Sequence, residues 1–445
     1  MGLLWSSSVT IPSSVLIIGS GVFGLSTAYS LCKNPLFDNT SITLVDRQPF
    51  PSPDGSSIDT SRIVRPDYAS PPYTRLASAA QSLWRTTFAP QHYHENGLCI
   101  TASGSEEKYV SSSLANVQAL GTGKIEVLKN SDDVKRVTGT ENASGSAGYI
   151  NWSSGWVDAE GAMRWLHSKI SQLNRVNFLT GTVTKLLINH TTHAVSGAHL
   201  QDGRTLTASL TILSAGAWTP SLLDLRGIAN ATGQVLVYLP ITPSEESRLA
   251  TLPTLLNLST GLFLIPPSQG LLKIARHGHG YANPTTIPHP ESANPSDTIT
   301  VSLPPHSASH SQSVPQEGES ACRAFLSHVY PSLSYTSSSS SRPFTKTRVC
   351  WYTDTQTGDF LISYHPKYTG LFVATGGSGH AFKFLPVIGD KIVECVLGNT
   401  PEDFRGKWEW PVKRVSEELW EGDGSRGGPI GMVLGEEMAK IESKL

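Results

Sequence analysis

The pattern of apolar and polar positions predicts a strand, a turn of small residues and a helix at three places along the chain. The first unit begins with a continuous apolar run over residues 15–18, typical of a strand buried on both faces, and its helix ends at about residue 32. Similar units are predicted over residues 210–218 and 372–397. Strands that alternate with helices in this way indicate an α/β fold.

The segments between these units have a different character. Residues 176–188 and 194–208 show the alternation of a β-meander with an Asp-Gly turn. Residues 91–150 and 221–344 are rich in Ser, Pro and His and predict irregular structure, with surface loops over 283–313 and 337–341. We therefore expect a nucleotide-binding domain from residues 1–90, 151–220 and 345–400, a second domain from 91–150 and 221–344, and a tail over 401–445 that ends in a short helix.

The first turn carries the pattern Gly-x-Gly-x-x-Gly at Gly19, Gly21 and Gly24. In a dinucleotide-binding turn, the first glycine permits the tight turn, the second lets the backbone approach the pyrophosphate, and the third lets helix and strand pack closely. The helix N-terminus then offers unpaired N–H groups to the phosphates. Asp46 ends the next predicted strand and is placed to accept hydrogen bonds from ribose hydroxyls. The unit predicts dinucleotide binding, with FAD and NAD both open at this point.

Composition narrows the possible partners and compartments. Lys plus Arg is 34 and Asp plus Glu is 36, so no basic surface is expected, which argues against a nucleic-acid partner. Five cysteines without paired spacing favour a reducing compartment over a disulfide framework. The apolar runs have the length of strands, so no membrane span is expected, and the N-terminus lacks the charged region of a signal peptide.

The last three residues, Ser443, Lys444 and Leu445, match a peroxisomal address. This match predicts binding to the peroxisomal import receptor and a peroxisomal location. The alternative is a helix end that stops at these residues by coincidence.

Five sequence blocks in a fixed order carry a resemblance to a known family: IIGSGVFG from residue 17, DTSRIVR from 59, LSAGAW from 213, RVCWYTDT from 348 and GGSGHAFKFLP from 376. With these blocks, residues 14–400 resemble the sarcosine oxidase family of FAD-dependent amine oxidases, which includes fungal oxidases of pipecolate, saccharopine and fructosyl amino acids. The resemblance implies an α/β FAD-binding domain of the glutathione-reductase type and a second, mixed β-sheet (α+β) domain that covers the substrate.

The same resemblance implies that FAD is attached covalently, through the sulfur of Cys350 to the 8α-methyl group of the flavin. Arg348 and Lys346 precede this cysteine and are expected to lower the pKa of its thiol. The alternative is an inert buried thiol, which is how we interpret Cys32, Cys99, Cys322 and Cys395. The residues implied to contact FAD are Gly19, Gly21, Val22, Phe23, Gly24, Asp46, Arg47, Ser61, Arg62, Val183, Ala215, Gly216, Trp218, Cys350, Gly377, Gly379, His380, Phe382 and Lys383.

The resemblance also assigns residues to the substrate carboxylate. Arg65 corresponds to the arginine that binds the carboxylate, and Lys383 corresponds to its partner. A guanidinium fork and an ammonium together hold a carboxylate in one orientation. The alternative for Arg65 is a surface ion pair with Asp67.

Two further residues are implied to act at the flavin. Lys273 corresponds to the lysine that promotes reaction with dioxygen, because a cation beside the flavin stabilises the charge that develops there. Alternation in this predicted strand places Lys273 and Ala275 on the same face. His277 corresponds to the histidine that lines the amine pocket, which implies a catalytic or substrate-binding role.

Departures from the family patterns bear on the substrate. Fructosyl amino acid oxidases carry an acidic pair after the lysine, where this chain has Arg276 and His277. Residues 407–411 provide no clear counterpart of a further arginine of those enzymes, and a histidine of sarcosine oxidases corresponds to Ile58. We therefore expect a substrate other than plain sarcosine or a glycated amino acid.

Together these inferences predict a monomeric FAD-dependent oxidase of a secondary amine, such as an N-alkyl or cyclic amino acid. Hydride transfer to flavin N5 and reoxidation by dioxygen would give an imine and hydrogen peroxide, and no metal ion is expected. Three alternatives stay open: a fructosyl amino acid oxidase, a biosynthetic flavoenzyme whose iminium closes a ring, and an FAD-binding protein without catalysis.

Overall fold

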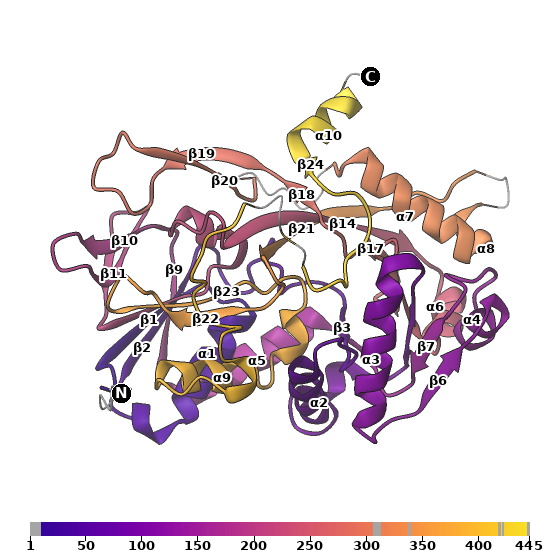
Figure 1. Ribbon diagram of the computed structural model, residues 1–445, viewed down its shortest axis with the longest axis horizontal. Coiled ribbons are helices and arrows are strands. Elements are labelled where there is room, and N and C mark those ends of the chain that lie inside the picture. The colour runs from indigo at the N-terminus through magenta and orange to yellow at the C-terminus, as the bar shows by residue number, and fades with distance from the viewer. Residues whose placement is uncertain (1–9, 306–312, 337–339, 417–419, 421, 443–445) are drawn as a thin grey trace.

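The computed structural model describes residues 10–305, 313–336, 340–416, 420 and 422–442. Two large β-sheets, one of six strands and one of ten, organise this part of the chain (Figure 1). They meet where the short helix η4 (Gly216–Ser221) contacts two long strands of the larger sheet, β14 (Ala229–Pro240) and β21 (Lys346–Thr355).

The six-stranded sheet contains the strands of all three predicted strand–turn–helix units, although the strand of the second unit leads only into the short 3₁₀ helix η4 and not into an α-helix. Five neighbouring strands run parallel, and the strand at one edge is antiparallel to its neighbour. The order is β22 (Leu361–Tyr364), β23 (Leu371–Thr375), β13 (Leu210–Leu213), β1 (Ser14–Ile18), β2 (Ser41–Asp46) and β9 (Val176–Thr180).

Two different layers cover this sheet. Val15 and Ile17 of β1 pack against helices on one face, whereas Leu16 and Ile18 pack against a small antiparallel sheet on the other. The helices are α1 (Val22–Lys33), α5 (Ala159–Leu173) and α9 (Ile388–Val396), and the antiparallel strands are β10 (Val183–Asn189), β11 (Ala194–Leu200) and β12 (Thr205–Thr207).

This helix–sheet–sheet layering confirms the predicted α/β class. The interpretation of residues 176–180 as part of the meander was wrong, because these residues form β9 and pair in parallel with β2. Alternation over five residues does not distinguish the edge strand of a parallel sheet from a meander strand.

The ten-stranded sheet is mixed. β14 is its longest strand and pairs in antiparallel fashion with β21 on one edge and with β17 and β18 on the other. The full order is β24 (Met432–Val433), β18 (Tyr281–Ala282), β14, β17 (Leu271–Arg276), β16 (Leu262–Ser268), β15 (Thr254–Asn257), β5 (Leu98–Thr101), β7 (Gly148–Asn151) and β6 (Ile125–Leu128), with β21 beside β14.

The two faces of this sheet have different neighbours. Leu272 and Ile274 of β17 pack with α7 (Gln316–Val329) on one face. Ala275 and Cys350 pack with α3 (Glu107–Ala119) on the other face. Lys273 therefore lies on the α3 side with Ala275, as the alternation predicted.

The prediction of irregular structure for residues 91–150 and 221–344 was wrong for most of their length. These segments contain strands of the large sheet and short helices that bury only a narrow apolar stripe, so polar residues dominate their composition. Further elements of the described chain are α2 (Pro71–Thr86), α4 (Ser131–Thr138), α6 (Pro243–Leu249), α8 (Pro331–Ser334), β3 (Arg62–Val64), β4 (Tyr93–His94), β8 (Gly155–Val157), η1 (Pro35–Phe37), η2 (Pro90–His92), η3 (Gly104–Glu106), η5 (Ala381–Phe384) and η6 (Glu402–Phe404).

A hairpin replaces the first predicted surface loop. β19 (Pro284–Pro288) and β20 (Thr298–Ser302) pair in antiparallel register within residues 283–313. Ile299 and Val301 are buried in a small cluster, while Thr286, Thr298 and Thr300 are exposed, which explains the polar composition of the segment. Residues 306–312, and 337–339 of the second predicted loop, lie outside the described residues.

Beyond residue 400 the chain packs against the body of the protein. Trp408 is fully buried, stacks on Phe404 with 3.9 Å between ring centroids, and donates a hydrogen bond to the Tyr73 hydroxyl. The predicted terminal helix is confirmed as α10 (Leu434–Glu442), and residues 443–445 lie outside the described part. No helix within the described ranges has the length and apolar character needed to cross a membrane.

Candidate active site

The turn between β1 and α1 requires glycine at two positions. Gly19 has a φ of +107°, and a Cβ there would collide with the carbonyl of Ser214. A Cβ at Gly24 would collide with the carbonyl of Gly19, so helix and strand pack as closely as the motif predicted. α1 then begins at Val22 without an acidic residue in its first turn. This turn is suited to bind an anion at the positive end of the helix dipole.

A cavity of about 1120 Å³ opens from this turn. Small-molecule and cofactor sites have volumes of about 300–1,000 Å³, so the cavity is large enough for a dinucleotide. The predicted cofactor residues that line it are Gly19, Gly21, Val22, Phe23, Asp46, Arg47, Arg62, Val183, Ala215, Gly216, Trp218, Gly377, Gly379 and Phe382. Outside the lining are Gly24, Ser61, Cys350, His380 and Lys383.

Asp46 lies at the carboxyl end of β2, on the wall of the cavity. One of its carboxylate oxygens accepts hydrogen bonds from the backbone N–H and the hydroxyl of Ser20, both at 2.7 Å, and the other accepts one from Ser52 at 2.8 Å. The next residue, Arg47, lies over the Trp218 ring at 4.7 Å and pairs with Asp54. The end of β2 thus presents polar side chains, held by hydrogen bonds and ion pairs, to the cavity.

Cys350 lies on β21 and is only 2% exposed. The cation at its sulfur is Arg62, whose Nη2 lies 3.5 Å from Sγ and which also lines the cavity. The prediction that Arg348 and Lys346 act on this thiol is not supported by their contacts. Arg348 donates to the carbonyls of residues 55 and 58, and Lys346 lies over the Tyr238 ring.

Lys273 forms the centre of a buried ion-pair cluster on the α3 side of the sheet. Its Nζ lies 2.6 Å from the Asp59 carboxylate and 2.8 Å from the carbonyl of Ser61, and the side chain is 2% exposed. Asp59 also accepts a hydrogen bond from the Tyr238 hydroxyl at 2.6 Å and pairs with Arg62. Burial lowers the pKa of Lys273 to about 8, against the opposing effect of Asp59.

Burial of Asp59 would by itself raise the pKa of its carboxyl group. The neighbouring cations Lys273, Arg62 and Arg348 override this effect and hold the pKa well below its usual range. Asp59 is therefore ionised at neutral pH and keeps Lys273 in place beside it.

Arg65 and Lys383 meet at a shared aromatic ring. The guanidinium of Arg65 and the ammonium of Lys383 each lie 5.0 Å from the centre of the Tyr68 ring, and Lys383 donates to the Tyr68 hydroxyl at 2.8 Å. Burial lowers the pKa of Lys383 well below its ordinary value, and the charge of Arg65 adds to this shift. The structure thus brings together the two residues predicted to bind a carboxylate.

The alternative reading of Arg65 as a surface residue paired with Asp67 was wrong. Arg65 is only 5% exposed, and Asp67 accepts hydrogen bonds from Asn151 and Ser154 instead. Among the described residues, Nη1 of Arg65 has no hydrogen bond within normal geometry although it is buried, and the guanidinium interacts with the Tyr109 hydroxyl. A buried guanidinium nitrogen without a partner is costly unless a ligand binds to it.

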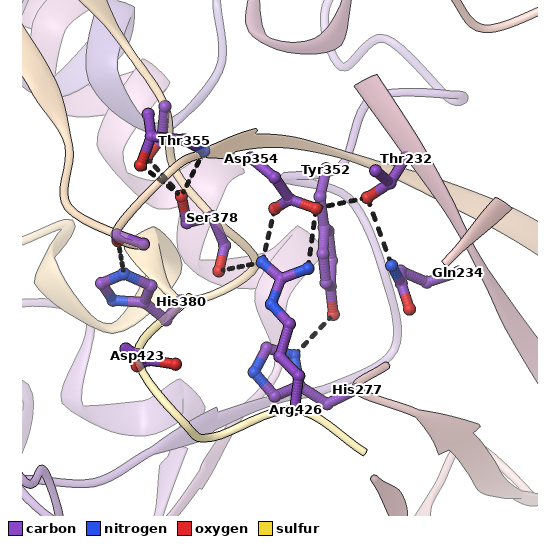
Figure 2. A network of polar contacts seen from close by, with 12 residues as sticks. Thr232, Gln234, His277, Tyr352, Asp354, Thr355, Ser378, His380, Asp423 and Arg426 are labelled. Carbon is purple, nitrogen blue, oxygen red and sulfur yellow. Dashed lines mark hydrogen bonds and ion pairs between the residues drawn. The ribbon is translucent and has the colours of Figure 1, made fainter. Parts of the chain in front are cut away.

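His277 belongs to the network of polar contacts in Figure 2. Its Nδ1 lies 3.5 Å from the Tyr352 hydroxyl and its Nε2 lies 3.4 Å from Oγ of Ser425. Burial lowers the pKa of His277 well below its ordinary value, and the cations Arg426 and Arg65 lower it further. The imidazole is therefore neutral at physiological pH.

The family of the chain follows from a match that spans most of its length. The family described as "DAO: FAD dependent oxidoreductase" matches residues 14–395. The chain belongs to this family of FAD-dependent oxidoreductases. The oxidoreductase is 32% identical to the amino acid oxidase imqH of Aspergillus flavus over 459 residues, covering 87% of this chain and 93% of the relative. It is 28% identical to the L-saccharopine oxidase of Schizosaccharomyces pombe over 425 residues, covering 91% and 95%.

Solved structures agree with this assignment. The oxidoreductase superposes on the fructosamine oxidase Amadoriase II from Aspergillus fumigatus with a TM-score of 0.78 and 28% identity, covering 96% of each chain. These similarities confirm the predicted fold, an FAD-binding domain of the glutathione-reductase type with a second mixed-sheet domain. They also confirm the resemblance to amine and amino acid oxidases.

The residues of the oxidoreductase fit FAD. The glycine turn leaves no room for a side chain at Gly19 or Gly24, and the cavity that opens from it is lined by most of the predicted contact residues. Gly24 lies behind the turn against Gly19, and Ser61 is held by Lys273 through its carbonyl. The His380 carbonyl accepts a hydrogen bond from Lys383 near Tyr68.

Three features of the oxidoreductase were missed from the sequence. Asp59 belongs to the DTSRIVR block, yet its pairing with Lys273 was not predicted. The β19–β20 hairpin and the residues that follow it line the cavity with side chains that include Ile287, His289 and Leu303. Arg426, treated as part of a tail, pairs with Asp354 inside the network of Figure 2. Asp59 in the DTSRIVR block and Asp354 in the RVCWYTDT block were the only sequence signals for the two ion pairs.

Proposed function

We propose that the oxidoreductase oxidises the secondary amine of an N-alkyl or cyclic amino acid. The observation that carries the proposal is the buried Nη1 of Arg65, which lacks a hydrogen-bond partner among the described residues; Arg65 and Lys383 both lie against the Tyr68 ring, and the charge of Arg65 acts on Lys383. Two clustered cations of this kind suit a carboxylate. Each turnover converts the amine and dioxygen into an imine and hydrogen peroxide, with two hydrogens passing from substrate to dioxygen.

Arg65 and Lys383 would orient the substrate by its carboxylate. The pKa of Lys383 is low because the residue is buried next to Arg65, and a bound carboxylate would raise it again. Protonation of Lys383 and binding of the carboxylate therefore support one another. The neutral His277 can accept a hydrogen bond from the substrate amine without placing a further positive charge in the pocket.

Bound FAD supplies the electron acceptor for the amine and the donor to dioxygen. Lys273 holds its proton below about pH 8 and places a positive charge on the α3 side of the sheet. Positive charge stabilises the anionic species that form when dioxygen is reduced. We infer that Lys273 serves the oxygen reaction, whereas Arg65, Lys383 and His277 serve amine binding.

We also propose that the sulfur of Cys350 is the covalent attachment point of FAD. Formation of the thioether removes one hydrogen from the thiol and one from the 8α-methyl group, and dioxygen takes up both as hydrogen peroxide. The proximity of Sγ to Arg62, which lines the cavity, supports this assignment. Acid precipitation of the purified protein should leave the flavin in the pellet, and Cys350→Ser should release it to the supernatant. Flavin release from the unaltered protein would refute the linkage.

The position of Arg276 argues against a glycated substrate. Its Nη1 lies 2.9 Å from both carboxylate oxygens of Glu317 on α7, so the guanidinium is held on the sheet face opposite Lys273. The likeness to Amadoriase II keeps fructosyl amino acids as the second candidate.

An amine panel with a hydrogen peroxide readout tests the proposed function. It should contain pipecolate, saccharopine, sarcosine, N-methyl aromatic amino acids and fructosyl-valine, with product mass spectra to detect ring closure. Turnover of a secondary amino acid supports the proposal. Turnover of fructosyl-valine alone, or of no amine, would refute it.

We further propose that the protein acts in peroxisomes as a monomer. Ser443, Lys444 and Leu445 support this location, because a free C-terminal Ser-Lys-Leu is bound by the import receptor. A fluorescent protein fused to the N-terminus should appear in peroxisomes, and removal of the last three residues should leave it in the cytosol. If removal of these residues leaves the location of the fluorescence unchanged, they do not act as the address.

A further inference from the structure

The C-terminal segment of residues 422–427, here called the C-terminal wall, crosses the network that contains His277 (Figure 2). Gly422 donates its N–H to the carbonyl of Gln356, and Gly427 forms a parallel bridge with Gly278. The wall is therefore attached at one end to the loop after β21 and at the other to the segment after β17. β21 carries Cys350 and the segment after β17 carries His277, which are both residues of the proposed site.

Arg426 is the main anchor of the wall. Its guanidinium pairs with both carboxylate oxygens of Asp354, with Nη1 2.7 Å from Oδ2, and the two side chains are 12% and 9% exposed. The same group donates to the carbonyl of Ser378 at 3.1 Å and to that of Gly278 at 3.2 Å. Arg426 thus links the end of β21, the third glycine-rich turn and the segment after β17.

Arg426 packs against Tyr352, which in turn contacts His277 of the amine pocket. The guanidinium of Arg426 lies 5.4 Å from the centre of the Tyr352 ring, whose hydroxyl contacts His277. The wall also contacts His277 from its own side, through Oγ of Ser425 at 3.4 Å and the N–H of Gly427, which donates to the His277 carbonyl at 3.4 Å. His277, which is partly exposed, therefore lies between Tyr352 and the wall.

Asp423 adds a negative charge to the same surface. One of its oxygens accepts hydrogen bonds from the N–H and the hydroxyl of Ser425, which fixes the carboxylate. Its charge acts on His380 and Lys383 and opposes the lowering of their pKa values. The carboxylate thus faces the cluster that contains the cation proposed to bind the substrate carboxylate.

We propose that the C-terminal wall forms one side of the amine pocket, and that Arg426 is the positioning residue that holds it there. The inference rests on the proposed function, because the pocket is defined by Arg65, Lys383 and His277. The wall covers one side of the partly exposed His277 and keeps its imidazole in a fixed orientation. Loss of the anchor would then weaken substrate binding more than it slows the chemical step.

The test compares four variants of the FAD-loaded protein. Arg426→Met removes the anchor, Arg426→Lys keeps the charge but not the paired contacts, and Arg426→Met/Asp354→Asn also removes the carboxylate that would otherwise be buried without its partner. Arg414→Met is the matched control, because Arg414 belongs to the same C-terminal region but pairs with Asp224 and is 48% exposed.

Two readouts separate this inference from the proposed function. The first is the rate at which diethyl pyrocarbonate modifies His277, measured by mass spectrometry of the labelled peptide. The second is KM and kcat for the amine found in the panel. Arg426→Met and the double variant should increase labelling by about tenfold, because a local opening exposes the imidazole. KM should rise by at least about tenfold with a smaller change in kcat.

Arg426→Lys should fall between the wild type and Arg426→Met, and Arg414→Met should match the wild type in both readouts. Wild-type labelling in both Arg426→Met and the double variant would overturn the proposal, and so would a fall in kcat at unchanged KM. If no amine is oxidised by the wild type, the proposed function fails, while the labelling rates still decide whether Arg426 holds the wall over His277.

Discussion

Replacing Asp59 by Asn would remove a buried negative charge beside Lys273 with little change in side-chain volume. The Asp59 carboxylate lies 2.6 Å from Nζ, and the two side chains are 1% and 2% exposed. The amide can still accept a hydrogen bond from Tyr238, so the main loss is electrostatic. We expect this variant to bind the amine normally and to react slowly with dioxygen.

The magnitude follows from the separation of the charges. Two unit charges about 4 Å apart interact by about 4 kcal/mol at an effective dielectric constant of about 20. This energy corresponds to a factor of about 10³ in proton affinity. Because burial already lowers the pKa of Lys273 to about 8, loss of Asp59 should make the lysine neutral at physiological pH.

Stopped-flow absorbance separates the two halves of the reaction. Anaerobic mixing with the amine should bleach the flavin at close to the wild-type rate, whereas reoxidation at neutral pH should be slower by about 10². In the wild type, reoxidation should fall as pH rises through about 8, since Lys273 loses its proton there. In Asp59→Asn the fall should move to lower pH, and in Lys273→Met it should be absent. A wild-type pH profile in Asp59→Asn would refute this reasoning.

Other variants test the remaining parts of the site and the core. Arg65→Met should weaken binding of the amino acid by at least about 30-fold, because a buried charge contact is lost, whereas Arg75→Met removes an exposed pair with Asp403 and should leave binding unchanged. Gly24→Ala should abolish the stoichiometric flavin absorbance of the purified protein, whereas Gly435→Ala, with open space around it, should retain it. Leu272→Ala should lower the free energy of unfolding by about 2–5 kcal/mol in urea titrations, because it opens a cavity in the core against α7; a wild-type denaturation midpoint would contradict this packing.

The parts of the fold that local sterics determine could be predicted from the sequence. Gly19 and Gly24 leave no room for a Cβ, so their spacing between an apolar strand and a helix predicted the turn and the first layer of the nucleotide-binding fold. Alternation along β17 also predicted the correct sheet face for Lys273, because successive side chains of a strand point to opposite faces.

Contacts between distant segments could not be predicted in this way. Asp59 and Lys273 are 214 residues apart, and Asp354 and Arg426 are 72 residues apart. From the sequence alone, a charged residue is expected at the solvent-exposed surface, because only the tertiary fold shows whether it is buried with a partner. The β19–β20 hairpin was missed because its exposed threonines outweigh a few buried apolar residues in composition.

The most direct test of the proposed site compares anaerobic flavin bleaching by L-pipecolate and by piperidine, which lacks the carboxylate. The account predicts bleaching by a cyclic or N-alkyl amino acid such as L-pipecolate and little by the amine without a carboxylate, with the difference lost in Arg65→Met. Equal bleaching by both compounds, or bleaching by neither L-pipecolate nor any other secondary amino acid, would contradict it.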